Sequence, residues 1–296
     1  MKNASRTKEL LRNVRRVEIK TKRLVDGLLQ GAYHSVFKGR GIEFSDVREY
    51  VVGDDIRNID WKVTARFNVP YVKEFVEERD LTLYILFDIS ASGLFGSTRE
   101  KRYIAAEIAA SLMFAALRNN DNVGLCLFTD RVELFFKPRK GRKHVMRLIR
   151  DMLYYEPLHR GTSLSNAMMF ISKLTKRRCI VFIISDFLSN EDFEKPLRLL
   201  RHRHDVIAIC LRDVREVELP DVGYVEIEDE ETGEQMLIDT SDPDFRKEYA
   251  RIMIERDKSI AEVMKRCKVD FIKIFTHERF EVPIKRFFML REKRIR

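Results

Sequence analysis

The sequence predicts a doubly wound α/β domain with a mostly parallel sheet, preceded by an N-terminal helix and a small β-rich extension. Continuous apolar runs that are typical of buried strands, such as LTLYILF and CIVFIIS, alternate with helical segments from residue 81 onward. Strands that are apolar on both faces and separated by helices indicate a parallel sheet between two helical layers. The length of 296 residues and the hydrophobic content of 45% allow a substantial core.

The elements follow in a regular order. The strand at 81–87 precedes a helix over about 99–118, strands at 122–128 and 132–136, and helices near 141–153 and 163–175. The strand at 179–185, a helix near 190–202 and the strand at 205–211 come next. An acidic hairpin near 224–239, a helix near 242–266 and the strand at 269–275 complete a domain that we place at residues 81–296.

Residues 1–80 have a different character. Apolar residues recur at helical spacing over 5–30, which predicts one long amphipathic helix: Leu10, Val14, Val17, Leu24 and Leu28. Short alternating runs and turn signals such as Gly53-Asp54-Asp55 predict a small β-rich extension up to residue 80. We interpret the many charges of this extension as an internal ion-pair network, with an interaction surface as the alternative.

Composition and charge argue against several classes of protein. The charged start lacks the apolar core of a secretory signal, and the longest apolar runs are shorter than the roughly 20 residues that cross a bilayer. Four distant cysteines without a CxxC pair indicate reduced thiols of a cytoplasmic protein. The net charge of +9 is concentrated at both ends without interleaved aromatic residues, so we expect solvated helix faces and no nucleic-acid binding.

Oxygen-bearing side chains follow two of the expected strands. FDISASG places Asp88, Ser90 and Ser92 after the strand at 81–87, and Asp186 follows the strand at 179–185. In the common strand order these two strands are neighbours, and ligands bind at their carboxyl ends. Thr162 lies on a loop that can reach the same edge. Five hard oxygen donors without His or Cys favour Mg²⁺ or Mn²⁺ over zinc.

Each of these side chains also has a simpler interpretation. Ser92 or Ser97 could cap the helix at 99–118, and Thr162 or Ser163 could cap the helix at 163–175. The hairpin carries a group of acids that we interpret as solvated, because consecutive turn residues point in different directions. These acids are Glu228, Asp229, Glu230 and Glu231.

The D-x-S-x-S motif at 88–92, Thr162 in GTSLS and Asp186 in ISDF resemble the metal-ion-dependent adhesion site (MIDAS) of von Willebrand factor A domains. The stretch at 37–80, from FKGRGIEF to FVEERD, resembles the signature of a bacterial family catalogued as domain of unknown function 58. Genes of that family often lie beside genes for MoxR-type AAA+ ATPases. The two resemblances together cover nearly the whole chain.

The resemblance implies a role for each site residue. Ser90, Ser92 and Thr162 would offer hydroxyls to the ion, Asp88 and Asp186 would act directly or through water, and a partner would supply the last ligand. Phe187 stands where many adhesion-type domains have Gly, so we expect a differently shaped last loop.

The implied function is a non-enzymatic, metal-dependent protein-binding module. It would act, chaperone-like, with a MoxR-type AAA+ ATPase in the maturation or assembly of a protein complex, and would bind a client protein through an acidic side chain. A Mg²⁺-dependent phosphohydrolase of haloacid dehalogenase type is one alternative, although that class needs a second Asp where this chain has Ser90. A structural scaffold with an empty metal site is another. No GxxxxGK[ST], HExxH or GxSxG motif is present.

Overall fold

The computed structural model of the 296-residue chain describes residues 14–15, 17–19, 21, 25, 33, 36–37, 43–67, 69–76, 81–97, 100–189, 191–228 and 233–295. Two compact units are present, one of residues 37–81 and one of residues 1–36 together with 82–296. The smaller unit ends within one residue of the expected boundary after residue 80, whereas residues 1–36 group with the α/β unit and not with the extension.

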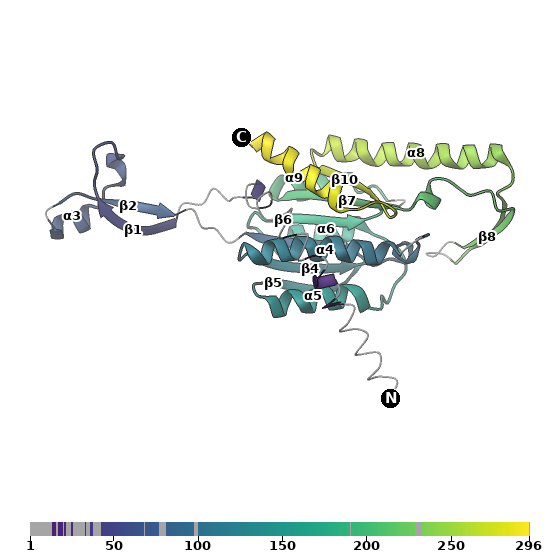
Figure 1. The fold of residues 1–296 in the computed structure, drawn as a ribbon, viewed down its shortest axis with the longest axis horizontal. Coiled ribbons are helices and arrows are strands. Elements are labelled where there is room, and N and C mark those ends of the chain that lie inside the picture. Colours follow the sequence, from purple (N-terminus) through teal and green to yellow (C-terminus); the bar gives the residue numbers. More distant parts are fainter. Residues whose placement is uncertain are drawn as a thin grey trace, which may run out of the picture. The chain divides into compact units, whose positions relative to one another are not determined.

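A six-stranded sheet forms the centre of the larger unit (Figure 1). Its strands are β3 (Thr82–Asp88), β4 (Asn122–Phe128), β5 (Val132–Arg139), β6 (Ile180–Ser185), β7 (Asp205–Arg212) and β10 (Asp270–Phe275). Their order is β10-β7-β6-β3-β4-β5, and of these six strands β5 alone runs antiparallel to its neighbour. The expected α/β fold with a mostly parallel sheet is confirmed.

Helices cover both faces of this sheet. They are α4 (Lys101–Arg118), α5 (Arg142–Tyr154), α6 (Leu164–Leu174), α7 (Glu194–Arg203), α8 (Pro243–Arg266) and α9 (Glu281–Ile295). One core joins α6, α7 and α8 to the same sheet face, and α4 packs beside α5 on the other (Figure 1). The sequence analysis did not anticipate α9, which buries Ile284 and Phe288 and exposes Val282, Met289 and Leu290 among its charged residues.

The smaller unit is a two-stranded antiparallel sheet with short helices between its strands. The strands are β1 (Glu43–Glu49) and β2 (Tyr71–Val76), and the helices are the 3-10 helix Ile56–Asn58 and α3 (Trp61–Phe67). Asp54 accepts two hydrogen bonds of 2.7 Å from Arg48 and one of 2.9 Å from the Val51 amide. The turn at residues 51–54 is therefore held by an ion pair within this unit.

Two further expectations concern the ends of the larger unit. Within the helix expected over 5–30, residues 14, 15, 17–19 and 21 are α-helical and residue 25 is π-helical, and the other positions lie outside the described residues. The expected hairpin is present as β8 (Tyr224–Glu228) and β9 (Gln235–Asp239). Glu228 is exposed, whereas Asp229, Glu230 and Glu231 lie outside the described residues.

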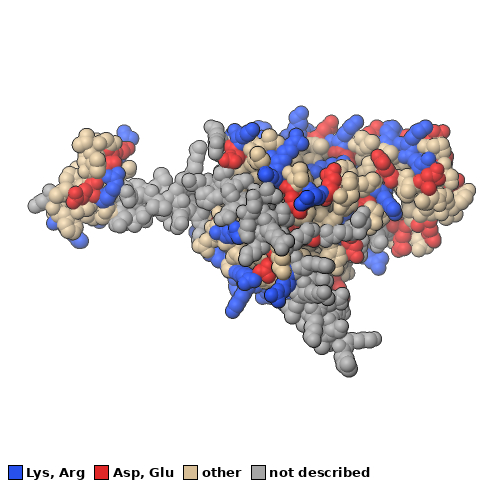
Figure 2. All heavy atoms as spheres, in the orientation of Figure 1, with Lys and Arg blue, Asp and Glu red and all other residues tan. Residues whose placement is uncertain are grey.

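Charge, thiols and hydropathy complete the description. Basic side chains gather over β5 and α5 (Figure 2), where six of them are exposed: Lys137, Arg139, Arg142, Lys143, Arg147 and Arg150. The four cysteines are free and buried. In the part of the chain that the structure describes, no helix combines the length and the apolar character needed to cross a membrane.

Candidate metal centre

The candidate site lies where the order of the strands reverses. β3 is parallel to both of its neighbours, with β4 on one side and β6 on the other, so the chain winds outward from β3 in two directions. The carboxyl ends of β3 and β6 carry Asp88 and the pair Ser185-Asp186. Ligands of open α/β sheets bind at such a reversal. The predicted neighbourhood of these two strands is confirmed.

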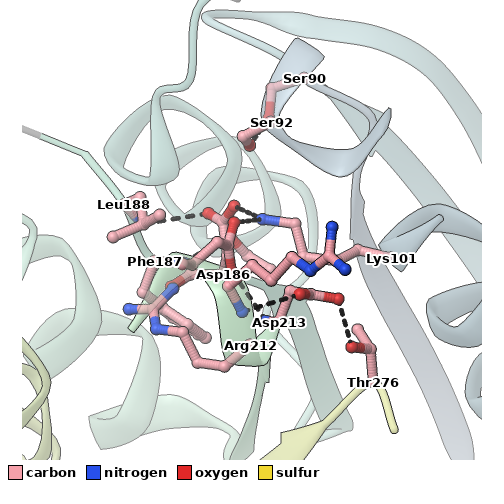
Figure 3. Close-up of polar contacts among 12 residues, drawn as sticks. Ser90, Ser92, Lys101, Asp186, Phe187, Leu188, Arg212, Asp213 and Thr276 are labelled. Atoms are coloured by element: carbon pink, nitrogen blue, oxygen red, sulfur yellow. Dashed lines mark hydrogen bonds and ion pairs between the residues drawn. The ribbon is translucent and has the colours of Figure 1, made fainter. Parts of the chain in front are cut away.

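The loop after β3 is held by its own polar side chains. Asp88 Oδ1 accepts a hydrogen bond of 2.9 Å from the amide of Ser90. Aspartate side chains commonly accept such a bond from the backbone two residues later in a turn. The hydroxyl oxygens of Ser90 and Ser92 lie 3.1 Å apart and share a hydrogen bond (Figure 3). The alternate spacing in the sequence therefore gathers three oxygen-bearing side chains within one turn.

Neither Ser92 nor Ser97 caps α4, which was the alternative interpretation of these serines. Ser92 lies in the 3-10 helix Ala91–Leu94, and the N-cap position of α4 is Glu100, which makes no side-chain capping bond. The hydroxyl of Ser97 donates instead to Asp213 Oδ2 at 3.0 Å. The serines of FDISASG are therefore not committed to the start of α4.

Asp88, Ser92 and Asp186 line one small cavity with Lys101 and Ser185. Its volume of ≈ 20 Å³ exceeds the roughly 10–15 Å³ that a single water needs. The Ser185 hydroxyl donates to Asp88 Oδ2 at 2.6 Å and joins the two strand ends across the site. The sequence analysis missed Ser185, although a polar residue that ends an apolar strand beside Asp186 is a visible signal.

Asp186 is paired with a buried lysine. The amino group of Lys101, the first residue of α4, lies 2.7 Å from Asp186 Oδ2 (Figure 3). The same amino group also pairs with Glu216. The side chains of Lys101 and Asp186 are only 2% and 3% exposed. Burial acts to raise the pKa of Asp186, but the charge and hydrogen bond of Lys101, helped by Arg212, hold that pKa below its ordinary value. Asp186 is therefore ionised and already neutralised by the protein.

The carboxyl group of Asp88 is in the opposite situation. Burial and, second, the negative charge of Asp186 raise the pKa of Asp88 to about 6, although hydrogen bonds from Ser185 and Ser90 act to lower it. The ionised form of Asp88 is thus disfavoured where it lies, and a cation in the adjacent cavity would stabilise it. This donor set, a carboxylate beside two hydroxyls, fits a hard divalent cation.

Thr162 lies on a neighbouring loop and does not line the cavity. That loop is joined to the first one by a hydrogen bond of 3.2 Å from the Ala91 amide to the Arg160 carbonyl. Ser163, and not Thr162, caps α6, because its hydroxyl accepts from the amide of Asn166. Three of the five expected residues, Asp88, Ser92 and Asp186, thus line one cavity. Ser90 is hydrogen-bonded to Ser92, and the loop of Thr162 is joined to the same turn.

The last loop bends sharply at Phe187. This residue has a φ of 57°, in the left-handed region that glycine adopts most easily and that costs other residues about 1–3 kcal/mol. Its ring is buried, with centroids 6.0 Å from that of Phe193 and 6.4 Å from that of Phe271. Core packing therefore holds a turn that glycine would make without strain.

A second layer of charges lies behind Asp186 and was also missed. Arg212 is fully buried and donates to the Asp186 carbonyl at 2.6 Å and to Asp257 at 2.9 Å. Asp213 accepts a hydrogen bond of 2.6 Å from the hydroxyl of Thr276 (Figure 3). Arg212 and Asp213 come at the end of the apolar run DVIAICL, so the strand-end reasoning that found Asp88 could have found them.

The fold and the site together define an α/β domain with a hydroxyl- and carboxylate-lined cavity at the reversal point of a mostly parallel sheet. Residues 46–259 match a family model described as "Protein of unknown function DUF58". The chain is also 32% identical over 277 residues to Uncharacterized protein Rv1480 of Mycobacterium tuberculosis strain H37Rv, a match that covers 93% of this chain and 87% of that protein. The chain belongs to the DUF58 family, as the stretch at 37–80 indicated.

Two solved structures are similar to this chain at low sequence identity. BatB from Bacteroides thetaiotaomicron is 14% identical with a TM-score of 0.45, over 72% of this chain and 99% of that one. The SpRpn10 VWA domain is 16% identical with a TM-score of 0.35, over 45% of this chain and 76% of that one.

Proposed function

We propose that this chain is a non-enzymatic protein-binding module that depends on Mg²⁺ or Mn²⁺. The ion would be held by five residues: Asp88, Ser90, Ser92, Thr162 and Asp186. The observation that carries the proposal is the cavity that Asp88, Ser92 and Asp186 line together, with Ser90 hydrogen-bonded to Ser92.

The distribution of charge supports a site that binds a partner. Because Lys101 neutralises Asp186, the carboxylate left to balance a divalent ion is that of Asp88. An ion held by one such carboxylate and neutral hydroxyls keeps positive charge, and that charge attracts an acidic side chain from another protein. We assign Asp186 a role through water, with Lys101 fixing its position.

The residue two positions after Asp88 favours protein binding over phosphate hydrolysis. A phosphohydrolase of haloacid dehalogenase type needs a second Asp there as an acid and base. In this chain the position is Ser90, which is buried and hydrogen-bonded to Ser92. A neutral hydroxyl offers the ion an oxygen ligand but does not supply acid–base catalysis at neutral pH.

The partners follow from the family resemblance. We propose that the module acts in the bacterial cytoplasm with a MoxR-type AAA+ ATPase and binds a client protein that offers an acidic side chain to the ion. Its role would be the maturation or assembly of that client's complex.

One observation favours a second candidate, a scaffold that needs no metal. Lys101 lines the same cavity, and its ammonium group already pairs with Asp186. An internal cation of this kind opposes the entry of a second cation, since like charges repel strongly where water is excluded.

Thermal unfolding with and without Mg²⁺ distinguishes the two candidates. If the site binds the ion, saturation at about 100 times the dissociation constant adds roughly 2.7 kcal/mol to the free energy of unfolding. Asp88→Ala removes that gain, whereas the control Asp244→Ala, at an exposed position in the first turn of α8, keeps it. An unchanged melting temperature with Mg²⁺ and Mn²⁺ refutes the metal-dependent module and leaves the scaffold.

A pull-down from the native organism tests the partner separately. We expect the wild-type chain to recover a AAA+ ATPase in Mg²⁺, and a Ser90→Ala, Ser92→Ala double variant or added chelator to abolish that recovery. Equal recovery under all conditions would place the partner surface elsewhere on the chain.

A further inference from the structure

A groove runs along the outer edge of β10, between α8 and α9. In the described part of the sheet, β10 is the terminal strand and pairs with β7 on one side. Alternate N–H and C=O groups of an edge strand face away from its sheet, where another strand can pair with them. Residues 269–273 line the groove with side chains of α8 and α9, and its volume is ≈ 440 Å³. A groove along a strand edge is suited to the addition of an extended segment.

The lining of the groove combines apolar and basic side chains. Phe287 and Leu290 supply apolar surface, and Lys265 and Arg286 supply positive charge. The acid in the lining, Asp270, is already paired with Arg291 and Arg294 at 2.8 and 3.0 Å. The described contacts include no ion pair for Lys265 or Arg286. An occupant of the groove should therefore be acidic, with apolar side chains among its acids.

The β8–β9 hairpin of the same chain has this chemistry. Its two strands pair with each other and with no other described strand, so both outer edges are open. Glu226 and Glu228 are exposed, and so are apolar side chains: Ile227 (41%), Met236 (64%) and Leu237 (68%). A two-stranded hairpin is marginally stable by itself and gains from having its apolar side chains covered.

The hairpin cannot occupy the groove of its own chain. It ends at Asp239, just before the N-terminus of α8, whereas the groove is lined by Met264 and Lys265 near the C-terminus of that helix. About 20 helical residues separate the two sites, which is roughly 30 Å at 1.5 Å per residue. Figure 1 shows β8 at one end of α8 and α9 towards the other, and Figure 2 shows acidic side chains gathered where β8 lies.

We propose that the β8–β9 hairpin of one copy of this chain docks into the β10 groove of a second copy. The hairpin adds strands to the edge of the sheet, and its glutamates, Glu226 and Glu228, meet Lys265 and Arg286. Each copy then offers one hairpin and one groove, so the contact joins different surfaces and builds a ring or a filament. Two other occupants are disfavoured because the groove is positively charged. The groove of a second copy carries the same positive charge, and so does the basic start of the chain, MKNASRTK.

Sedimentation velocity of the full chain tests the assignment. We expect the average mass to rise with protein concentration and to fall with added NaCl, because salt screens the charge pairs. Glu226→Lys with Glu228→Lys abolishes association, and so does Lys265→Glu with Arg286→Glu. The four substitutions in one chain restore it, because they exchange the charges of the two surfaces. Arg139→Glu with Lys143→Glu, the same change of charge over β5 and α5, leaves association intact.

Three results would overturn the proposal. One is a chain that stays monomeric at every concentration, and another is an equal loss of association in the β5 and α5 control. The third is a monomeric chain that binds a synthetic peptide of residues 224–239 through Lys265 and Arg286, which would assign the groove to an acidic strand of a different protein. The whole series is run in chelator, so its outcome is independent of the metal site.

Discussion

Replacement of Lys101 by methionine is expected to destabilise the chain and, at the same time, to strengthen its binding of Mg²⁺. The Lys101 side chain is 2% exposed and pairs with both Asp186 and Glu216. Loss of one partner from a buried ion pair costs about 3–5 kcal/mol, because it leaves buried charge without compensation. At roughly 2–4 °C per kcal/mol for a domain of this size, the melting temperature in chelator should fall by about 10 °C.

Mg²⁺ should reverse much of that loss. Without the lysine ammonium, the carboxylate of Asp186 loses its ion-pair partner in the cavity, so the ion gains attraction and loses a like-charged neighbour. We expect the dissociation constant, measured by isothermal titration calorimetry, to fall at least about tenfold, which corresponds to about 1.4 kcal/mol. Lys173→Met, at an exposed position of α6, serves as the control and should change neither quantity.

The reasoning fails if the Lys101→Met variant melts with the parent in chelator, since the ion pair would then contribute nothing to stability. It also fails if Mg²⁺ raises the melting temperatures of parent and variant by the same amount. That second result would mean that Lys101 and the ion do not share one site.

Three further predictions concern the same cavity. The pKa of Asp88 is raised from 3.8 to about 6, so between these pH values the folded state, in chelator, holds a proton that the unfolded state has lost. The free energy of unfolding should therefore fall by about 3 kcal/mol as pH rises from 3.8 to 6. Chemical denaturation at several pH values measures this fall, and a fall of the same size in Asp88→Asn would show that Asp88 is not its cause. Ser90→Ala and Ser92→Ala should each weaken the stabilisation by Mg²⁺ while the fold, monitored by circular dichroism, is retained, and a full Mg²⁺ response in both variants would remove the hydroxyls from the ligand set. Hydrolysis of p-nitrophenyl phosphate in Mg²⁺ should not exceed that of the buffer, and turnover that disappears in Asp88→Asn would show a phosphohydrolase instead.

The features of the fold and site that could be predicted are those that depend on residues close together in the sequence. β6 is buried throughout and β3 at its five central positions, and such apolar runs identify both strands. The common strand order then predicts that they are neighbours, as they are. The turn that joins Ser90 and Ser92 depends on residues two positions apart, and it too was visible. Local spacing was sufficient for both.

The parts that were missed depend on contacts between distant segments. Lys101 and Asp186 are 85 positions apart, and nothing in the helical pattern of α4 indicates that its first residue turns inward to a carboxylate. α9 was not anticipated because its burial is confined to Ile284 and Phe288 within a basic segment. The ionic state of the site therefore required the packed structure.

Phe187 ties one side of the candidate site to the hydrophobic core. Its left-handed backbone is tied to an aromatic ring that packs against Phe193 and Phe271, so the loop of Asp186 cannot rearrange without withdrawing that ring from the core. The opposite loop, with Ser90 and Ser92, is held by hydrogen bonds among its own residues and by one from Ala91 to Arg160. The two sides of the cavity are thus anchored differently, one through an aromatic ring in the core and the other through hydrogen bonds between loops, so a change at Phe193 or Phe271 would reach Asp186 without touching the serines.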